Sequence, residues 1–191
     1  MKKKLIITAI IAFAFFASCA KPPVEEMNNA IAAVARAEND PDVMAYAVNS
    51  LARAREALSN MQTEADAKRY EQAKKFALDA ENLAERAIAD AKNFIGRQKD
   101  EAASALSLMK EALVTTEDTL QNAHASGGKG LDLPRLDNDF ASARQTAGQA
   151  EMANEESRYG EAIEHSQNAR SALSLITSEI SQAAISANRK K

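Results

Sequence analysis

The feature that most restricts the fold of this chain is the spacing of its apolar residues. They recur at alternating steps of three and four, an average period of 3.5 that places them along one side of a helix. We call these the heptad positions. They are Met44, Ala47, Leu51, Ala54, Leu58, Met61 and Ala65; Tyr70, Ala73, Ala77, Ala80, Ala84, Ala87 and Ala91; Ala102, Leu106, Met109, Leu113, Thr116, Leu120 and Ala123; Leu133, Leu136, Phe140, Ala143, Ala147 and Ala150; Tyr159, Ala162, Ser166, Ala169, Leu173, Ile176, Ile180 and Ala183. The pattern predicts an all-α fold of packed helices.

Residues that interrupt helices are few and clustered, which favours long helices. The 191 residues include only six glycines and four prolines, and most of these lie in two short stretches near residues 21–24 and 126–134. We therefore predict helices over 24–39, 41–65, 67–124, 132–154 and 156–187. Further apolar residues widen the heptad stripe, which favours a bundle over a two-stranded coil. They are Ile31, Phe76, Leu83, Ile88 and Ile163.

The two halves of the chain correspond to each other at an offset of 89 residues. RYEQAKKFALDAENL (69–83) aligns with RYGEAIEHSQNARSA (158–172), and LARAREALSN (51–60) aligns with FASARQTAGQ (140–149). This internal repeat predicts an elongated antiparallel helical bundle of two tandem three-helix units, 24–95 and 96–191, that share the long central helix. The arrangement is similar to that of spectrin-like bundles. The phase of the heptad pattern shifts around Gly96. A continuous helix can absorb this shift as a stutter, or the shift marks a kink in the helix.

The amino-terminal segment has the three parts of a secretory signal. Lys2–Lys4 are followed by an apolar run from Leu5 to Ala17, which is too short to span a membrane, and then by small residues and Cys19. The stretch Phe16-Ala17-Ser18-Cys19 resembles the lipobox of bacterial lipoproteins, although Phe16 stands where Leu is commonest. The resemblance implies a signal peptide over 1–18, a diacylglycerol on the thiol of Cys19, a palmitate-type acyl chain on its amino group, and a lipidated tether over 19–23.

Two family resemblances concern the helices. Pro23 with Met27–Ala30, and Lys68–Ala73 followed by Ala77 and Ala80, are similar to the motifs of small Ala-rich bacterial envelope lipoproteins, a domain-of-unknown-function family. The spacing around Tyr70 and Tyr159 matches part of a tetratricopeptide second helix. The first-helix pattern of that repeat is missing, and its 34-residue period fits the offset of 89 poorly.

Composition excludes several classes of function. Removal of the signal would lower Lys plus Arg from 24 to 21 against 27 Asp plus Glu, which gives a net charge of −6. A chain with this charge is not expected to bind nucleic acid, which requires a basic patch or stripe. The motifs of catalytic, cofactor and metal sites are missing, so we expect a protein that is not an enzyme and has no cofactor or metal. Tyr70 and Tyr159 fall at heptad positions and are interpreted as packing anchors, with contact to a partner as the alternative.

These observations predict a membrane-anchored periplasmic lipoprotein that acts as a helical scaffold or interaction adaptor in the cell envelope. The expected partners are the membrane, through lipid on Cys19, and other envelope proteins. Ala20 follows Cys19 in place of the Asp that favours inner-membrane retention, so we expect the outer membrane with the body in the periplasm. The alternative is a binding module that holds a peptide or an apolar ligand in a groove between helices. The oligomeric state stays open.

Overall fold

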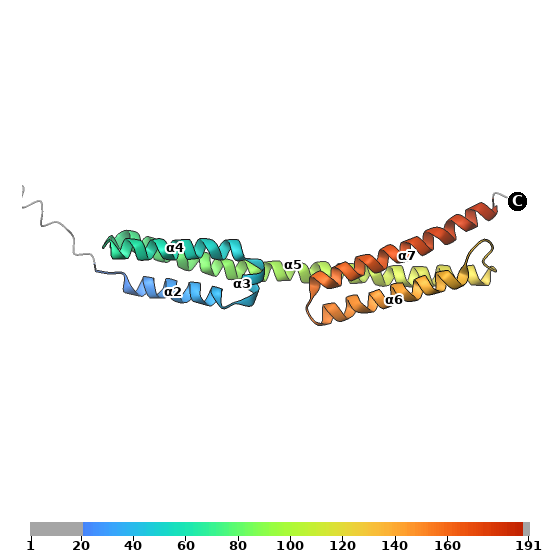
Figure 1. Cartoon of the computed structure of the whole chain (residues 1–191), viewed down its shortest axis with the longest axis horizontal. Coiled ribbons are helices and arrows are strands. Elements are labelled where there is room, and N and C mark those ends of the chain that lie inside the picture. The colour runs from blue at the N-terminus through green and yellow to red at the C-terminus, as the bar shows by residue number, and fades with distance from the viewer. Residues whose placement is uncertain (1–20, 189–191) are drawn as a thin grey trace, which may run out of the picture. The chain divides into compact units, whose positions relative to one another are not determined.

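The computed structural model describes residues 21–188, and this part of the chain is built from α-helices (Figure 1). The described range contains no β-strand, which confirms the all-α prediction. The helices are α2 (Val24–Glu38), α3 (Pro41–Tyr46), α4 (Val48–Asp66), α5 (Tyr70–Ala125), α6 (Leu133–Glu155) and α7 (Tyr159–Asn188). Residues 1–20, which include the predicted signal peptide and Cys19, lie outside the described range.

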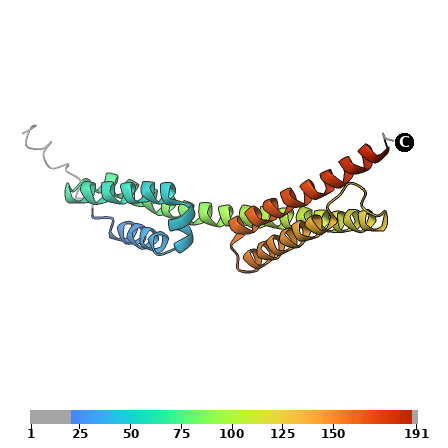
Figure 2. The ribbon, with the colours of Figure 1, turned by 45° about the vertical axis from the view of Figure 1, so that its right-hand side comes forward.

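The chain divides into two compact units, of which the first ends at Phe94 and the second begins at Ile95. The first unit contains α2, α3, α4 and the first part of α5, and the second contains the rest of α5 with α6 and α7. In the second unit α6 and α7 lie along α5 (Figure 2). The helix predicted over 67–124 is a single helix of 56 residues with Gly96 inside it.

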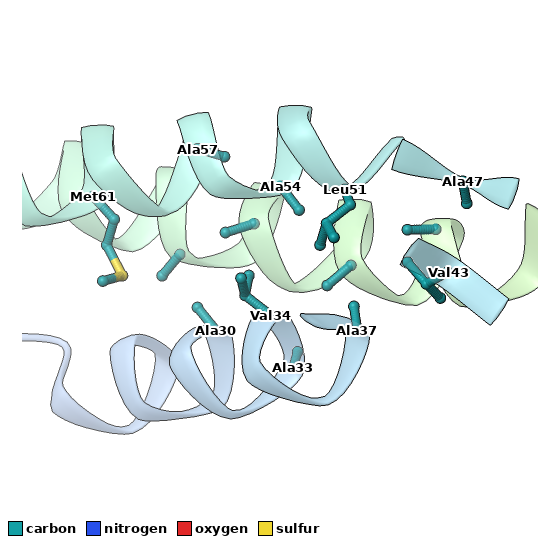
Figure 3. Close-up of a cluster of buried hydrophobic side chains, with 14 of the residues drawn as sticks. Ala30, Ala33, Val34, Ala37, Val43, Ala47, Leu51, Ala54, Ala57 and Met61 are labelled. Atoms are coloured by element: carbon teal, nitrogen blue, oxygen red, sulfur yellow. The ribbon is translucent and has the colours of Figure 1, made fainter. Parts of the chain in front are cut away.

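The core of the first unit is built mainly from alanine, which lets helix backbones approach closely. Four larger side chains lie among the alanines: Leu51 and Met61 of α4, Val43 of α3 and Val34 of α2, all at most 2% exposed. Figure 3 shows the labelled side chains of α2 and α4 pointing toward each other. Because the alanines contribute little apolar area each, these larger residues supply a large share of the stabilisation that comes from burial.

The prediction of one helix over 41–65 was wrong, because the chain breaks at Ala47. This residue has φ −130° and ψ 28°, which separates α3 from α4. The Asp40 carboxylate accepts hydrogen bonds from the backbone N–H groups of Asp42 and Val43, and Val43 is fully buried. No proline or glycine lies between 42 and 66. The break therefore comes from tertiary packing, which buries Val43 in place of the predicted Met44.

Burial follows the predicted heptad positions closely. Met44 is the one heptad position that is exposed, at 47% of its surface, and the other heptad positions are buried or half-buried. Of the residues expected to widen the stripe, Ile31 is 44% exposed, so that prediction was wrong, whereas Phe76, Leu83, Ile88 and Ile163 are at least half-buried.

Two helices begin three residues later than predicted because a left-handed residue stands before each. Lys68 has φ 59°, its N–H donates to the Ala65 carbonyl, and the N–H of Arg69 donates to the Glu64 carbonyl. These are the two hydrogen bonds of a Schellman motif. Ser157 has φ 61° with the same pair of bonds at the end of α6. The two turns lie 89 residues apart, which supports the internal repeat.

A glycine at either turn is expected to stabilise the protein. A side chain in the left-handed region costs roughly 1–2 kcal/mol, and glycine avoids this cost but loses more entropy on folding. Lys68→Gly and Ser157→Gly should therefore each raise the free energy of unfolding by up to about 1 kcal/mol. Thermal melts followed by circular dichroism measure the effect. Lys68→Ala keeps the Cβ and serves as the control, and a lower midpoint for the glycine variants would contradict the turn geometry.

The core of the second unit contains one polar group without a partner. Ser166 of α7 is fully buried, and its Oγ makes no hydrogen bond within the described residues. The residue 89 positions earlier is Ala77, which is also fully buried. A buried polar atom that loses its water without gaining a hydrogen bond destabilises the folded state by about 1–3 kcal/mol. The first unit shows that alanine fits the same place in the repeat.

We therefore expect Ser166→Ala to raise the free energy of unfolding by about 1 kcal/mol or more, because it removes the unpaired hydroxyl. The reverse change at the matched position, Ala77→Ser, should lower it. Denaturant titration of both variants measures the difference. Ser171→Ala on the exposed side of α7 should change stability by less than about 0.5 kcal/mol. Equal effects at 166 and 171 would show that burial of the hydroxyl is not the cause.

Candidate functional site

The predicted lipidation site, Cys19, lies outside the described residues, but the segment after it is described. Lys21 and Pro22 are exposed, Pro23 is buried, and α2 begins at Val24, whose backbone N–H donates to the Pro22 carbonyl at 2.9 Å. The folded body thus starts within five residues of Cys19. At about 3.5 Å per extended residue, a lipid on Cys19 would hold the start of α2 within roughly 20 Å of a bilayer surface.

Tyr70 and Tyr159 occupy equivalent places, each as the first residue of a helix after a left-handed turn. Both are half-buried. Tyr159 packs against the cluster formed by Ala102, Ala105, Ala153, Ala162 and Ile163, and its hydroxyl donates to Ser157 Oγ at 3.4 Å. These contacts give Tyr159 a packing role. The α5 residues of the cluster, Ala102 and Ala105, correspond at the offset of 89 to positions 13 and 16, which lie outside the described range.

The shifted pKa values belong to exposed ion pairs. A hydrogen bond from Lys74 lowers the pKa of Glu26, and the same bond raises the pKa of Lys74; this pair joins α2 to α5. A hydrogen bond from Arg69 lowers the pKa of Glu64. A hydrogen bond to Glu179 raises the pKa of Arg135. Because solvent screens such exposed pairs, each contributes little to stability.

Histidines and acidic residues form no metal-binding group within residues 21–188. His124 Nε2 lies 2.9 Å from Asp137 Oδ1 on the exposed surface, where the pair connects the end of α5 to α6. His165 is half-buried on α7. None of the described helices combines the length and the apolar content that crossing a bilayer requires.

Three exposed apolar side chains lie close in sequence to the break between α3 and α4. Met44, Tyr46 and Val48 are 47%, 51% and 50% exposed, and we call them the α3 patch. The Tyr46 ring stacks on Phe94, with ring centroids 4.7 Å apart and an angle of 21° between the ring planes. The stacking covers one face of the Tyr46 ring, and the residue as a whole stays 51% exposed. Large exposed apolar side chains gathered within a few residues of the chain are candidates for contact with a partner.

Open grooves run between helices within each unit. In the first unit, a groove of about 530 Å³ between α4 and α5 has Phe76 and Leu83 in its lining. In the second unit, a groove of about 770 Å³ separates α5 from α7, and one of about 670 Å³ separates α6 from α7. Neither the α3 patch nor these grooves was predicted from the amino-acid sequence. The sequence feature that could have indicated the grooves is the presence of large apolar residues outside the heptad positions, such as Leu108 and Leu175.

The comparison with protein families finds a Domain of unknown function (DUF4398) over residues 25–105. The match covers α2, α3, α4 and the part of α5 up to Ala105. It therefore includes the α3 patch, Tyr70 and the α4–α5 groove of the first unit. No curated protein and no solved structure matches the chain.

Proposed function

We propose that this chain is a lipid-anchored envelope protein, without enzymatic activity, that binds other envelope proteins through its helices. The anchor part of the proposal rests on Phe16-Ala17-Ser18-Cys19 at the end of an apolar run. The signal peptide would cover 1–18 and the lipidated tether 19–23. We further propose that the two units are tandem three-helix bundles that share α5 in a spectrin-like arrangement.

The observation that carries the adaptor role is the α3 patch. Three large apolar side chains, each about half exposed, lie within five residues of one another and surround a helix break that packing creates. A monomeric protein gains nothing from this exposure, because burying each side chain would contribute about 1–2 kcal/mol. A partner protein that covers the patch would recover this energy. Tyrosine and methionine are also residue types enriched at protein interfaces.

Photo-crosslinking in intact cells tests the adaptor role. A photoreactive amino acid at Tyr46 should give defined crosslinked bands that contain envelope proteins. The same amino acid at Lys75 is the control, because this exposed α5 residue lies 19 residues from Phe94, roughly 28 Å along the helix. Bands at Lys75 that match those at Tyr46 would show proximity without recognition. Absence of bands at Tyr46 would contradict the role.

A second candidate function is binding of a peptide or apolar ligand in an interhelical groove, favoured by the three grooves described above. Crosslinking from groove positions separates the two functions, because short peptides in place of whole proteins would support the groove.

The proposed location is the outer membrane with the body in the periplasm, supported by Ala20 after Cys19. Protease added to intact cells tests the orientation. Survival of the protein until the outer membrane is opened is the expected result, and rapid loss from intact cells would mean that the body faces outward.

A further inference from the structure

The groove between α5 and α7 in the second unit has exposed apolar side chains on both of its walls. Leu108 from α5 and Leu175 from α7 line it and are 44% and 74% exposed. Leu175 is the most exposed large apolar residue in the part of the chain that the structure describes. Neither residue occupies a heptad position, so neither contributes to the core of the unit. Their exposure has no role within a single copy.

Three of the five hydroxyl groups that line this groove donate to backbone carbonyls of their own helices. Thr115 Oγ1 donates to the Glu111 carbonyl at 2.9 Å, and Ser171 Oγ donates to the Gln167 carbonyl at 2.9 Å. Thr177 Oγ1 likewise donates to the Leu173 and Ser174 carbonyls. These side chains therefore present mainly carbon atoms to the groove. The groove suits an apolar surface better than it suits a polar ligand.

One acidic and one basic side chain stand on opposite walls. Glu111 is on α5 and Arg170 is on α7, and both are exposed. Neither forms an ion pair with any of residues 21–188, whereas the neighbouring Lys110 pairs with Glu151 of α6 at 2.9 Å. A surface that carries an unpaired anion on one wall and an unpaired cation on the other is complementary in charge to a copy of itself.

We propose that the α5–α7 groove binds the same groove of a second copy of this chain. In this unit α5 and α7 run in the same direction, with α6 antiparallel to both (Figure 2). A two-fold axis parallel to the helices places α5 of each copy over α7 of the other. Glu111 of each copy then faces Arg170 of the other, and the four leucines fill the two apposed grooves.

The small size of the groove surface predicts a weak contact between the two copies. The lining runs over residues 108–116 of α5 and 167–177 of α7. Ten helical residues extend roughly 15 Å, so a contact confined to them falls below the roughly 1,200 Å² that specific stable complexes bury. The dimer is therefore weak, with a dissociation constant in the micromolar range. This inference does not depend on the α3 patch, which lies in the other unit.

Sedimentation equilibrium of the full-length protein in detergent micelles, from low micromolar to several hundred micromolar, tests the proposal. The wild type should fit a monomer–dimer equilibrium. Leu108→Asp and Leu175→Asp should each weaken association at least about tenfold, because a carboxylate would be placed in the apolar contact. Val114→Asp is the matched control, since Val114 is 61% exposed on α5 but does not line the groove, and it should leave association unchanged.

Charge exchange tests the two-fold arrangement itself. Glu111→Lys and Arg170→Glu should each weaken association, because each brings like charges together in the dimer. The double variant should restore it. Three results would overturn the proposal. These are a wild type that stays monomeric at every concentration, a Val114→Asp variant that weakens association as much as the groove variants do, and a double variant that fails to recover association.

Discussion

Gly96→Pro is expected to lower the free energy of unfolding by roughly 3 kcal/mol or more. Gly96 lies inside α5, which runs without interruption from Tyr70 to Ala125. A proline there removes the backbone hydrogen bond to the carbonyl of residue 92 and places its ring against that carbonyl. The helix must then kink or break near residue 96. Circular dichroism should show lost helix content, and thermal melts should show a lower midpoint.

Gly96→Ala is the companion variant, and it should move stability in the opposite direction. A Cβ at Gly96 would have no atom within 4 Å other than those of its immediate neighbours and of the backbone of its own helix, and the φ of Gly96 lies outside the positive range. Alanine in a helix interior is favoured over glycine by about 1 kcal/mol, so the midpoint should rise. A lower midpoint for Gly96→Ala would mean that α5 is not continuous in solution and that residue 96 adopts a conformation that a side chain disfavours.

Leu51→Ala is expected to lower the free energy of unfolding by about 2 to 5 kcal/mol. Leu51 is fully buried in the first unit, between residues of α2, α3 and α5 that are mostly alanine. Short alanine side chains cannot move to fill the space that a leucine leaves, so most of the cavity should persist. Denaturant titration followed by circular dichroism measures the loss.

Leu78→Ala is the control for this variant, because it removes the same atoms from a residue that is 43% exposed on α5. The change should cost less than about 0.5 kcal/mol. Similar losses at 51 and 78 would show that the core described here does not determine the stability of the first unit.

Helix formation and the buried side of each helix were predictable, because both follow from a periodicity that the sequence displays directly. The continuity of α5 was left open, since a stutter and a kink produce the same phase change around Gly96. The late starts of α5 and α7 were not predictable, because Lys68 and Ser157 adopt a left-handed conformation that neither residue type favours.

The break at Ala47 could not be predicted from the neighbouring residues in the sequence. Residues 42–66 contain only acceptable helix formers, and nothing local separates them into two helices. The break depends on contacts distant in sequence, such as that of Tyr46 with Phe94. The α3 patch is a consequence of this break, so it could not be predicted from the sequence either. The groove residues were missed for a different reason: helical periodicity identifies what is buried, and an exposed leucine appears only as a residue outside the pattern.

The proposed attachment to the envelope membrane depends on the lipid anchor. Metabolic labelling of growing cells with an alkynyl fatty acid, followed by isolation of the protein and attachment of a fluorophore, tests it most directly. Cys19 is the only cysteine of the chain, so the wild type should carry the label and Cys19→Ala should lose it. Cys19→Ala labelled as strongly as the wild type, or a wild type without label, would contradict the anchor and with it the proposed attachment to the envelope membrane.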